Sequence, residues 1–111
     1  MEITFDDNKL KKLANDYRKC QKVMGPQRAR LYNIRLGDLT KAKTLEDVRN
    51  LPGNYHELKA NRKGQWACDL DQPYRLIFEP YENPIPINTA GKYIWFEIKG
   101  VEIIGIINYH E

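Results

Sequence analysis

The sequence predicts an α+β fold in one domain spanning residues 1–111: a short first strand, two antiparallel helices and a mainly antiparallel sheet of four or five strands. Two observations predict this fold. Apolar residues recur every three or four positions between residues 10 and 39, which is the spacing of one helical face. After Pro52-Gly53 the pattern changes to alternating and β-branched runs between turn residues, which is typical of strands. Helices followed by consecutive strands indicate a sheet with helices on one face.

The helical part begins after a short strand at residues 1–5, where apolar and polar residues alternate. A polar residue at positions 6–8 can cap the first helix by accepting a hydrogen bond from a free backbone N–H. The apolar face of this helix consists of Leu10, Leu13, Ala14, Tyr17, Cys20 and Met24. Gly25-Pro26 ends the helix and begins a second one, because proline suits a first helical turn. The apolar stripe of the second helix consists of Ala29, Tyr32, Leu36 and Leu39.

The strand part is divided by turn residues and by one proline-rich segment. Strands are expected at residues 55–59, 65–70, 74–79, 93–98 and 101–109. Turns are expected at residues 61–64, 71–73 and 99–100. The segment from Pro80 to Gly91 contains three prolines and is expected to be a loop.

Positive charge is concentrated in the middle of the chain. Residues 8–63 contain 15 Lys/Arg and 5 Asp/Glu, whereas residues 64–111 contain 3 and 7. This division favours one face that binds a polyanion. Two well-solvated helices would produce the same pattern, and the charge alone fits an acidic protein as well as RNA.

The cellular compartment follows from what the sequence lacks. No apolar run has the roughly 20 residues that a membrane span needs, and residues 1–5 do not resemble a signal peptide. Cys20 and Cys68 are far apart and form no CxxC pair, so we expect two buried or half-buried thiols. A cytoplasmic protein is the expectation.

Cleavage of RNA by its own 2′-hydroxyl requires a base, an acid and a group that stabilises the charge on the phosphorane. Histidine suits the first two roles because its pKa is roughly 6.5, and arginine suits the third because its donors match phosphate oxygens. The two histidines are His56 and His110, and Arg75 lies in an expected strand. A lysine acts as a base where neighbouring cations lower its pKa, and Lys59 lies close to Arg62 in sequence.

Each of these residues also has a purely structural interpretation. His56 could bond backbone at a strand end, Arg75 could pair with Asp69 or Glu97 across strands, and Trp66 could be a core residue. Two isolated histidines without a carboxylate at ligand spacing predict no metal site and no cofactor.

Three segments carry a resemblance to a known family. They are LKANRKGQW at residues 58–66, YRLIF at 74–78 and NYH at 108–110. These resemble the HigB toxins of the RelE/ParE superfamily, whose pattern is leucine-lysine-glycine-aspartate-arginine-x-glycine-x-tryptophan, an aromatic-arginine strand and a terminal aspartate-tyrosine-histidine. The similarity spans nearly the whole chain in the order of its elements.

The resemblance implies a metal-independent mRNA interferase that cuts messenger RNA in the decoding site of the ribosome, next to 16S rRNA. It implies a RelE-like fold and a cognate helix-turn-helix antitoxin, HigA-like, that forms an oligomer with the toxin. The implied cleavage centre consists of His56, Lys59, Arg75 and His110. The implied RNA contacts come from Arg62, Lys63, Trp66, Asn108 and Tyr109.

This chain departs from the family pattern at three places. Asn108 stands where the family has aspartate, Ala60-Asn61 replaces glycine-aspartate, and the segment from Pro80 to Gly91 lengthens the chain. Two alternatives therefore stay open. One is a ParE-like gyrase inhibitor, although such proteins generally lack the lysine, arginine and histidine constellation. The other is a catalytically degenerate toxin that acts only as an antitoxin-binding partner, which Asn108 favours.

Overall fold

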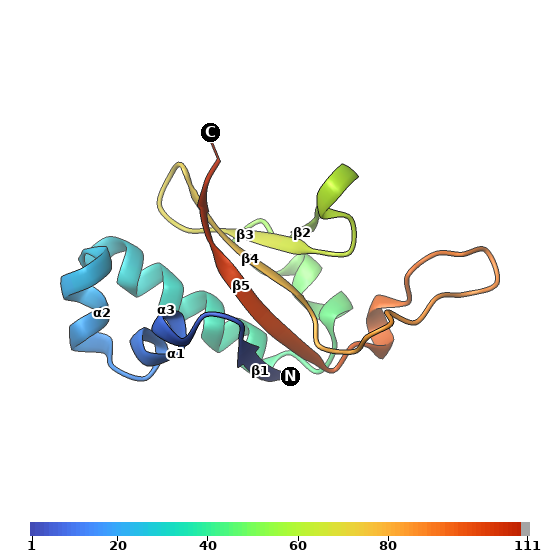
Figure 1. Ribbon diagram of the computed structural model, residues 1–111, viewed down its shortest axis with the longest axis horizontal. Helices are drawn as coiled ribbons and strands as arrows, with labels where there is room; N and C mark the ends of the chain where they lie inside the picture. Colours follow the sequence, from blue (N-terminus) through green and yellow to red (C-terminus); the bar gives the residue numbers. More distant parts are fainter. Residues whose placement is uncertain (110–111) are drawn as a thin grey trace.

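The computed structural model describes residues 1–109 and has the α+β architecture that the sequence predicts (Figure 1). The helices are α1 (Asn8–Ala14), α2 (Tyr17–Met24) and α3 (Pro26–Lys41), with short 3₁₀ helices η1 (Leu45–Asn50), η2 (Ala60–Arg62) and η3 (Trp95–Glu97). The strands are β1 (Glu2–Phe5), β2 (His56–Glu57), β3 (Trp66–Asp69), β4 (Tyr74–Pro80) and β5 (Gly100–Asn108).

The five strands form one sheet in the order β1-β5-β4-β3-β2. Strands β2 to β5 pair antiparallel with their neighbours, and β1 runs parallel to β5. The prediction of a mainly antiparallel sheet is therefore confirmed. An irregularity in the β4–β5 register lies between Ile77 and Phe78, so the pairing shifts by one residue along β5 there.

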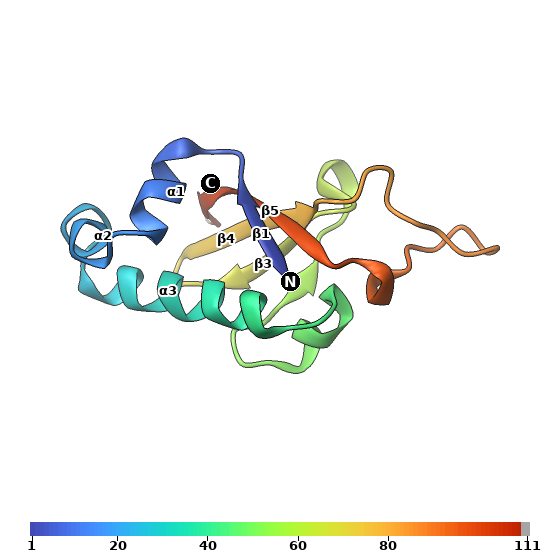
Figure 2. The same cartoon turned by 90° about the horizontal axis from the view of Figure 1, so that it is seen from below.

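One face of the sheet is covered by helices (Figures 1 and 2). The predicted stripe of α3 is buried and joins one apolar core with Tyr74, Leu76 and Phe78 of β4. Side chains alternate along a strand, so Arg75, Ile77 and Glu79 point to the opposite face. We call this opposite side the open face; the candidate site lies on it.

The prediction of a single helix before Gly25 is wrong, because this segment forms two helices. α1 ends at Ala14, and α2 begins at Tyr17. Asp16 separates them because its carboxylate accepts a hydrogen bond from the backbone N–H of Lys19 and so caps α2. The apolar spacing continues across this break, which is why the pattern alone predicts one helix.

The expected strand at residues 93–98 is also wrong. Tyr93 makes only an isolated bridge to Ile87, and Trp95 begins the 3₁₀ helix η3. The ring of Trp95 packs edge-on against Trp66 at 5.4 Å between centroids, so burial of the indole decides the local backbone. The expected turn at residues 99–100 is also not formed as predicted, since Gly100 is already the first residue of β5.

Residues 81–94 project from the body as an extended arm (Figures 1 and 2). Backbone bonds from Ile94 to Pro86 and from Tyr81 to Gly100, both 2.9 Å, join its two sides and tie it to β5. At its tip the side chain of Asn88 accepts from the backbone N–H groups of Ala90 and Lys92. The expected loop is thus a projection whose two sides are joined by backbone hydrogen bonds.

Two further features of the described residues concern the lengths of the helices and the two cysteines. None of the helices in residues 1–109 has the length and apolar character to cross a membrane. Cys20 and Cys68 are buried free thiols, as predicted, and burial raises the pKa of each.

Candidate functional site

A groove of about 900 Å³ lies on the open face, between the β2–η2 segment and the end of β5. One wall includes His56, Lys59 and Arg62, and the other includes Asn108 and Tyr109. In Figure 1 the C-terminal end of β5 and η2 both lie in the upper part of the view, away from helices α1, α2 and α3. The fold therefore brings together five of the nine predicted site residues from the two ends of the strand-rich half.

His56 has a defined ring orientation. Its Nδ1 lies 2.6 Å from the backbone oxygen of Asn54. A carbonyl oxygen only accepts, so Nδ1 carries the hydrogen and the neutral ring presents an unprotonated Nε2. Asn54 reaches this position with a left-handed backbone (φ 55°), which asparagine tolerates better than most residues. The turn before β2 thus leaves Nε2 of His56 able to accept a proton.

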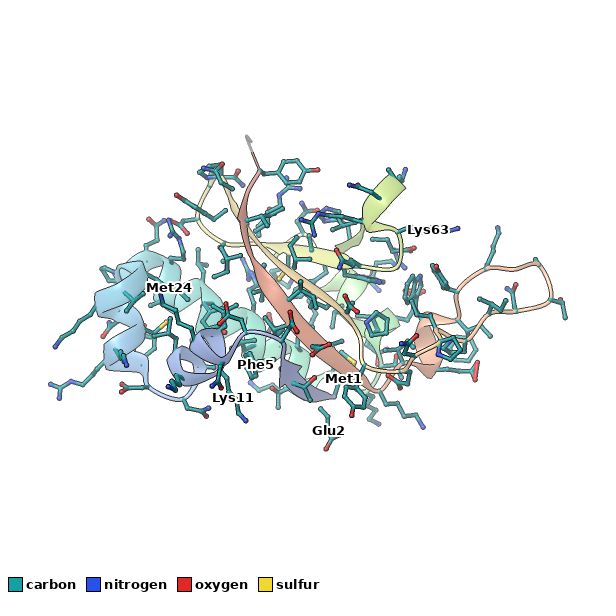
Figure 3. The ribbon with its side chains drawn as sticks, viewed as in Figure 1. Met1, Glu2, Phe5, Lys11, Met24 and Lys63 are labelled. Carbon is teal, nitrogen blue, oxygen red and sulfur yellow. The ribbon has the colours of Figure 1, made fainter. Side chains whose placement is uncertain are left out.

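The segment after β2 differs from the prediction. The expected strand at 55–59 stops at Glu57, and residues 60–62 form η2. Ala60 enters this turn with φ 56°, and the backbone N–H of Arg62 donates to the oxygen of Lys59 at 3.1 Å. Lys59 and Lys63 are therefore not on one face of a strand, as an extended backbone would place them. Lys59 is exposed at the groove, whereas Lys63 extends toward the arm (Figure 3), where its Nζ lies 5.6 Å from the ring centroid of Tyr93.

Arg62 is held by a chain of side-chain hydrogen bonds. Its Nη1 donates to Oε1 of Gln65 at 2.9 Å, and Nε2 of Gln65 donates to Oε1 of Glu79 at 3.0 Å. Neither Gln65 nor Glu79 is among the site residues predicted from the sequence. The available signal was a polar residue, Glu79, at the end of the otherwise apolar run Leu76–Phe78.

Arg75 lies next to the groove, where it stacks on the groove residue Tyr109. Its guanidinium carbon lies 3.6 Å from the ring centroid of Tyr109. Its Nε lies 3.4 Å from Oδ1 of Asp69, the cross-strand ion pair that the structural interpretation predicts. That Nε is buried and has no hydrogen-bond partner among the described residues. The backbone N–H of Tyr109 donates to the oxygen of Pro73 at 2.9 Å, which fixes the end of β5 beside Arg75.

The prediction that Trp66 contacts RNA is wrong. Its side chain is 0% exposed, stacked on Phe78 and covered by the guanidinium of Arg49 at 4.8 Å. A base cannot reach this ring in the folded protein. Burial of a large apolar ring outweighs any stacking role, as the structural interpretation of Trp66 holds.

His110 lies outside the described residues, so its predicted role as acid or base stays a prediction. The neighbouring Asn108 and Tyr109 line the groove. Within residues 1–109 no three His, Cys, Asp or Glu side chains are arranged to hold a metal ion.

The site thus offers a proton acceptor, several cations and an aromatic ring around one groove. Lys59 and Arg62 line the groove, and Arg75 borders it through the ring of Tyr109. Cations in such positions have the chemistry to hold a phosphate and to stabilise negative charge on it. Comparison with protein-family models finds no match, and comparison with curated proteins finds no significant relative.

Proposed function

We propose that this chain is a HigB-type toxin with a RelE-like fold, an mRNA interferase that cuts RNA on the ribosome by attack of the 2′-hydroxyl. The observation that supports it best is the groove, where His56, Lys59 and Arg62 face the end of β5 and Arg75 stacks on Tyr109. A general base, phosphate-binding cations and an aromatic ring in one groove suit cleavage of single-stranded RNA.

Each side chain has a role in this proposal. Nε2 of His56 takes the proton of the 2′-hydroxyl, because Nδ1 is committed to the oxygen of Asn54. Arg75 stabilises the charge on the phosphorane with its Nη donors. Lys59 assists proton transfer, and His110 protonates the departing 5′ oxygen.

The remaining contacts position the substrate. Arg62, Lys63 and Tyr109 bind mRNA, and the lysines of α1 and α2 rest on ribosomal RNA in the decoding site. Lysines on these two helices are exposed, which suits a polyanionic partner. A helix-turn-helix antitoxin forms a complex with the chain in the cytoplasm and neutralises it.

The test is induced expression with primer-extension mapping of mRNA ends. We expect growth to stop and transcripts to be cut within translated codons, and only while ribosomes translate them. His56→Ala and Arg75→Ala should remove the cuts while the purified variants keep the wild-type circular dichroism spectrum. DNA-damage signalling without mRNA cleavage would instead indicate a gyrase inhibitor. Growth without arrest in the absence of antitoxin would indicate a degenerate toxin.

A further inference from the structure

A second, smaller hollow borders Arg62 on the side away from the main groove. Its volume is about 210 Å³, and it shares Asn61 and Arg62 with the groove. Its other walls come from Gln65, Glu79 and the base of the arm at Glu82 and Ile85. It is smaller than the roughly 300–1,000 Å³ pockets that hold drug-sized ligands, so it suits a single ring system.

The hollow has a directional hydrogen-bond network in its wall. Nη1 of Arg62 donates to Gln65, and Gln65 donates to Oε1 of Glu79. These two bonds fix which end of the Gln65 amide faces which neighbour. Arg62 therefore stands in a fixed position between the two hollows, and no described residue donates to Oε2 of Glu79.

The hollow is lined by charges of both signs. Glu79 and Glu82 are its two carboxylates, and Arg62 and Lys63 are its two cations. Glu79 also stands directly opposite Glu102 in the β4–β5 register, and like charges directly opposite each other are destabilising. A ligand group that donates N–H bonds to Glu79 would offset part of this cost, whereas a phosphate near the carboxylates would be repelled.

We infer that this hollow is a subsite for the base of a nucleotide next to the cleaved phosphate, with Glu79 selecting bases that present an amino group. The inference depends on the proposed function, because the RNA strand must pass from the groove across Arg62. The backbone phosphate then lies on Arg62 and Lys63, and the base edge reaches Glu79. Gln65 is the positioning residue for Arg62.

Cytosine and uracil separate this subsite from general RNA binding. The two bases have the same ring size, but cytosine presents an amino donor where uracil presents a carbonyl acceptor. The carboxylate of Glu79 accepts from the cytosine amino group and repels the uracil oxygen. In Glu79→Gln the side-chain oxygen still accepts from Gln65, and the new amide NH₂ favours uracil.

The experiment measures binding of the full chain to fluorescently labelled hexacytidylate and hexauridylate by anisotropy. We expect wild-type protein to bind the cytidine oligomer about tenfold more tightly, and Glu79→Gln to lose or reverse that preference. Glu97→Gln is the matched control, because it removes one exposed carboxylate outside the hollow and should keep the preference. Equal binding of the two oligomers by wild-type protein overturns the inference, and this comparison requires no variant to fold.

Cleavage maps separate failure of the subsite from failure of the proposed function. In a purified translation reaction, we expect Glu79→Gln to shift the bases found beside the cut sites toward uracil. Unchanged cut sites would overturn the subsite and leave the proposed function intact. A cytidine preference in binding that Glu79→Gln abolishes, with no cutting by wild-type protein, would support the base site and refute the ribonuclease.

Discussion

The two faces of the sheet differ in composition: one is part of the apolar core, and the other carries the polar residues of the candidate site. On the helix-covered face, Tyr74, Leu76 and Phe78 belong to one apolar core. On the open face, the intervening Arg75 and Glu79 lie beside the groove and the smaller hollow. Alternation along a single strand thus separates the residues of the core from the polar residues that border the groove and the hollow.

The arginines follow the same division. Arg28 forms a bidentate pair with Asp71, at 2.8 and 3.2 Å, and lies 3.6 Å over the ring of Tyr74. Arg35 donates to the backbone oxygen of Asp69 at 2.7 Å. These donors are committed to the protein, whereas the Nη donors of Arg75 have no described hydrogen-bond partner. We therefore expect substitutions of different arginines to lower stability and activity.

The largest effect should come from the open face. Arg75→Ala should reduce the rate of RNA cleavage about 10²–10³-fold, because it removes the donors that stabilise the transition-state charge. The measurement is single-turnover cleavage in a purified translation reaction, accompanied by urea unfolding. Arg75→Lys is the matched control, because it keeps the charge and loses the fork of donors. Full activity of Arg75→Ala would remove Arg75 from the proposed centre.

A smaller effect, on stability and not on activity, is expected on the helix-covered face. Arg28→Ala should lower the free energy of unfolding by about 2 kcal/mol, because Asp71 loses two charge-assisted hydrogen bonds. Cleavage should persist at temperatures where the variant is folded. Urea unfolding followed by tryptophan fluorescence measures the loss. A variant with wild-type stability and no cleavage would contradict the division of the arginines.

Two buried tyrosines and a buried cysteine determine how stability should depend on pH above neutrality. Burial raises the pKa of Tyr55, Tyr32 and Cys68 above their ordinary values of 10.0, 10.0 and 9.0. The unfolded chain therefore releases these protons first as the pH rises above about 9, and stability falls. Each group contributes about 1.4 kcal/mol per pH unit above its unfolded pKa. Tyr55→Phe should make this decline shallower in urea unfolding between pH 9 and 11, and an unchanged slope would argue against burial of the Tyr55 hydroxyl.

The smallest effect is expected for the two thiols. Cys20 and Cys68 are buried, and burial raises the pKa of both, so little reactive thiolate is present at neutral pH. Labelling by a thiol reagent should be slow in buffer and fast in urea, as mass spectrometry can follow. Rapid labelling of either thiol in the folded protein would show that the covered face opens locally.

Much of the fold could be predicted because its signals are local. The stripe of α3 and the β-branched run of β5 specify their own elements. The break at Asp16 and the 3₁₀ helix at Trp95 could not be predicted, because a capping bond and the packing of an indole override the hydrophobic period.

The candidate site was predictable only in part. His56, Lys59 and Arg62 carry chemical signals in the sequence, and the fold brings them to one groove. Trp66 lies in the same basic and aromatic run, but its side chain faces the core. The sequence does not fix which face a strand residue occupies, because a shift of the register by one residue exchanges the two faces. Glu79 and Gln65 could not be assigned because their meeting depends on the β3–β4 pairing, where Trp66 lies opposite Phe78.

The most direct test of the proposed chemistry is cleavage of a message that carries one 2′-deoxynucleotide at a mapped cut site. The purified chain is added to a translating ribosome with this message or with the all-ribose message. We predict that the ribose message is cut to leave a cyclic or terminal phosphate on its 3′ end, and that the deoxy message stays intact at that site. Cutting of the deoxy message, or a 3′-hydroxyl product, would contradict attack by the 2′-hydroxyl and the role proposed for His56.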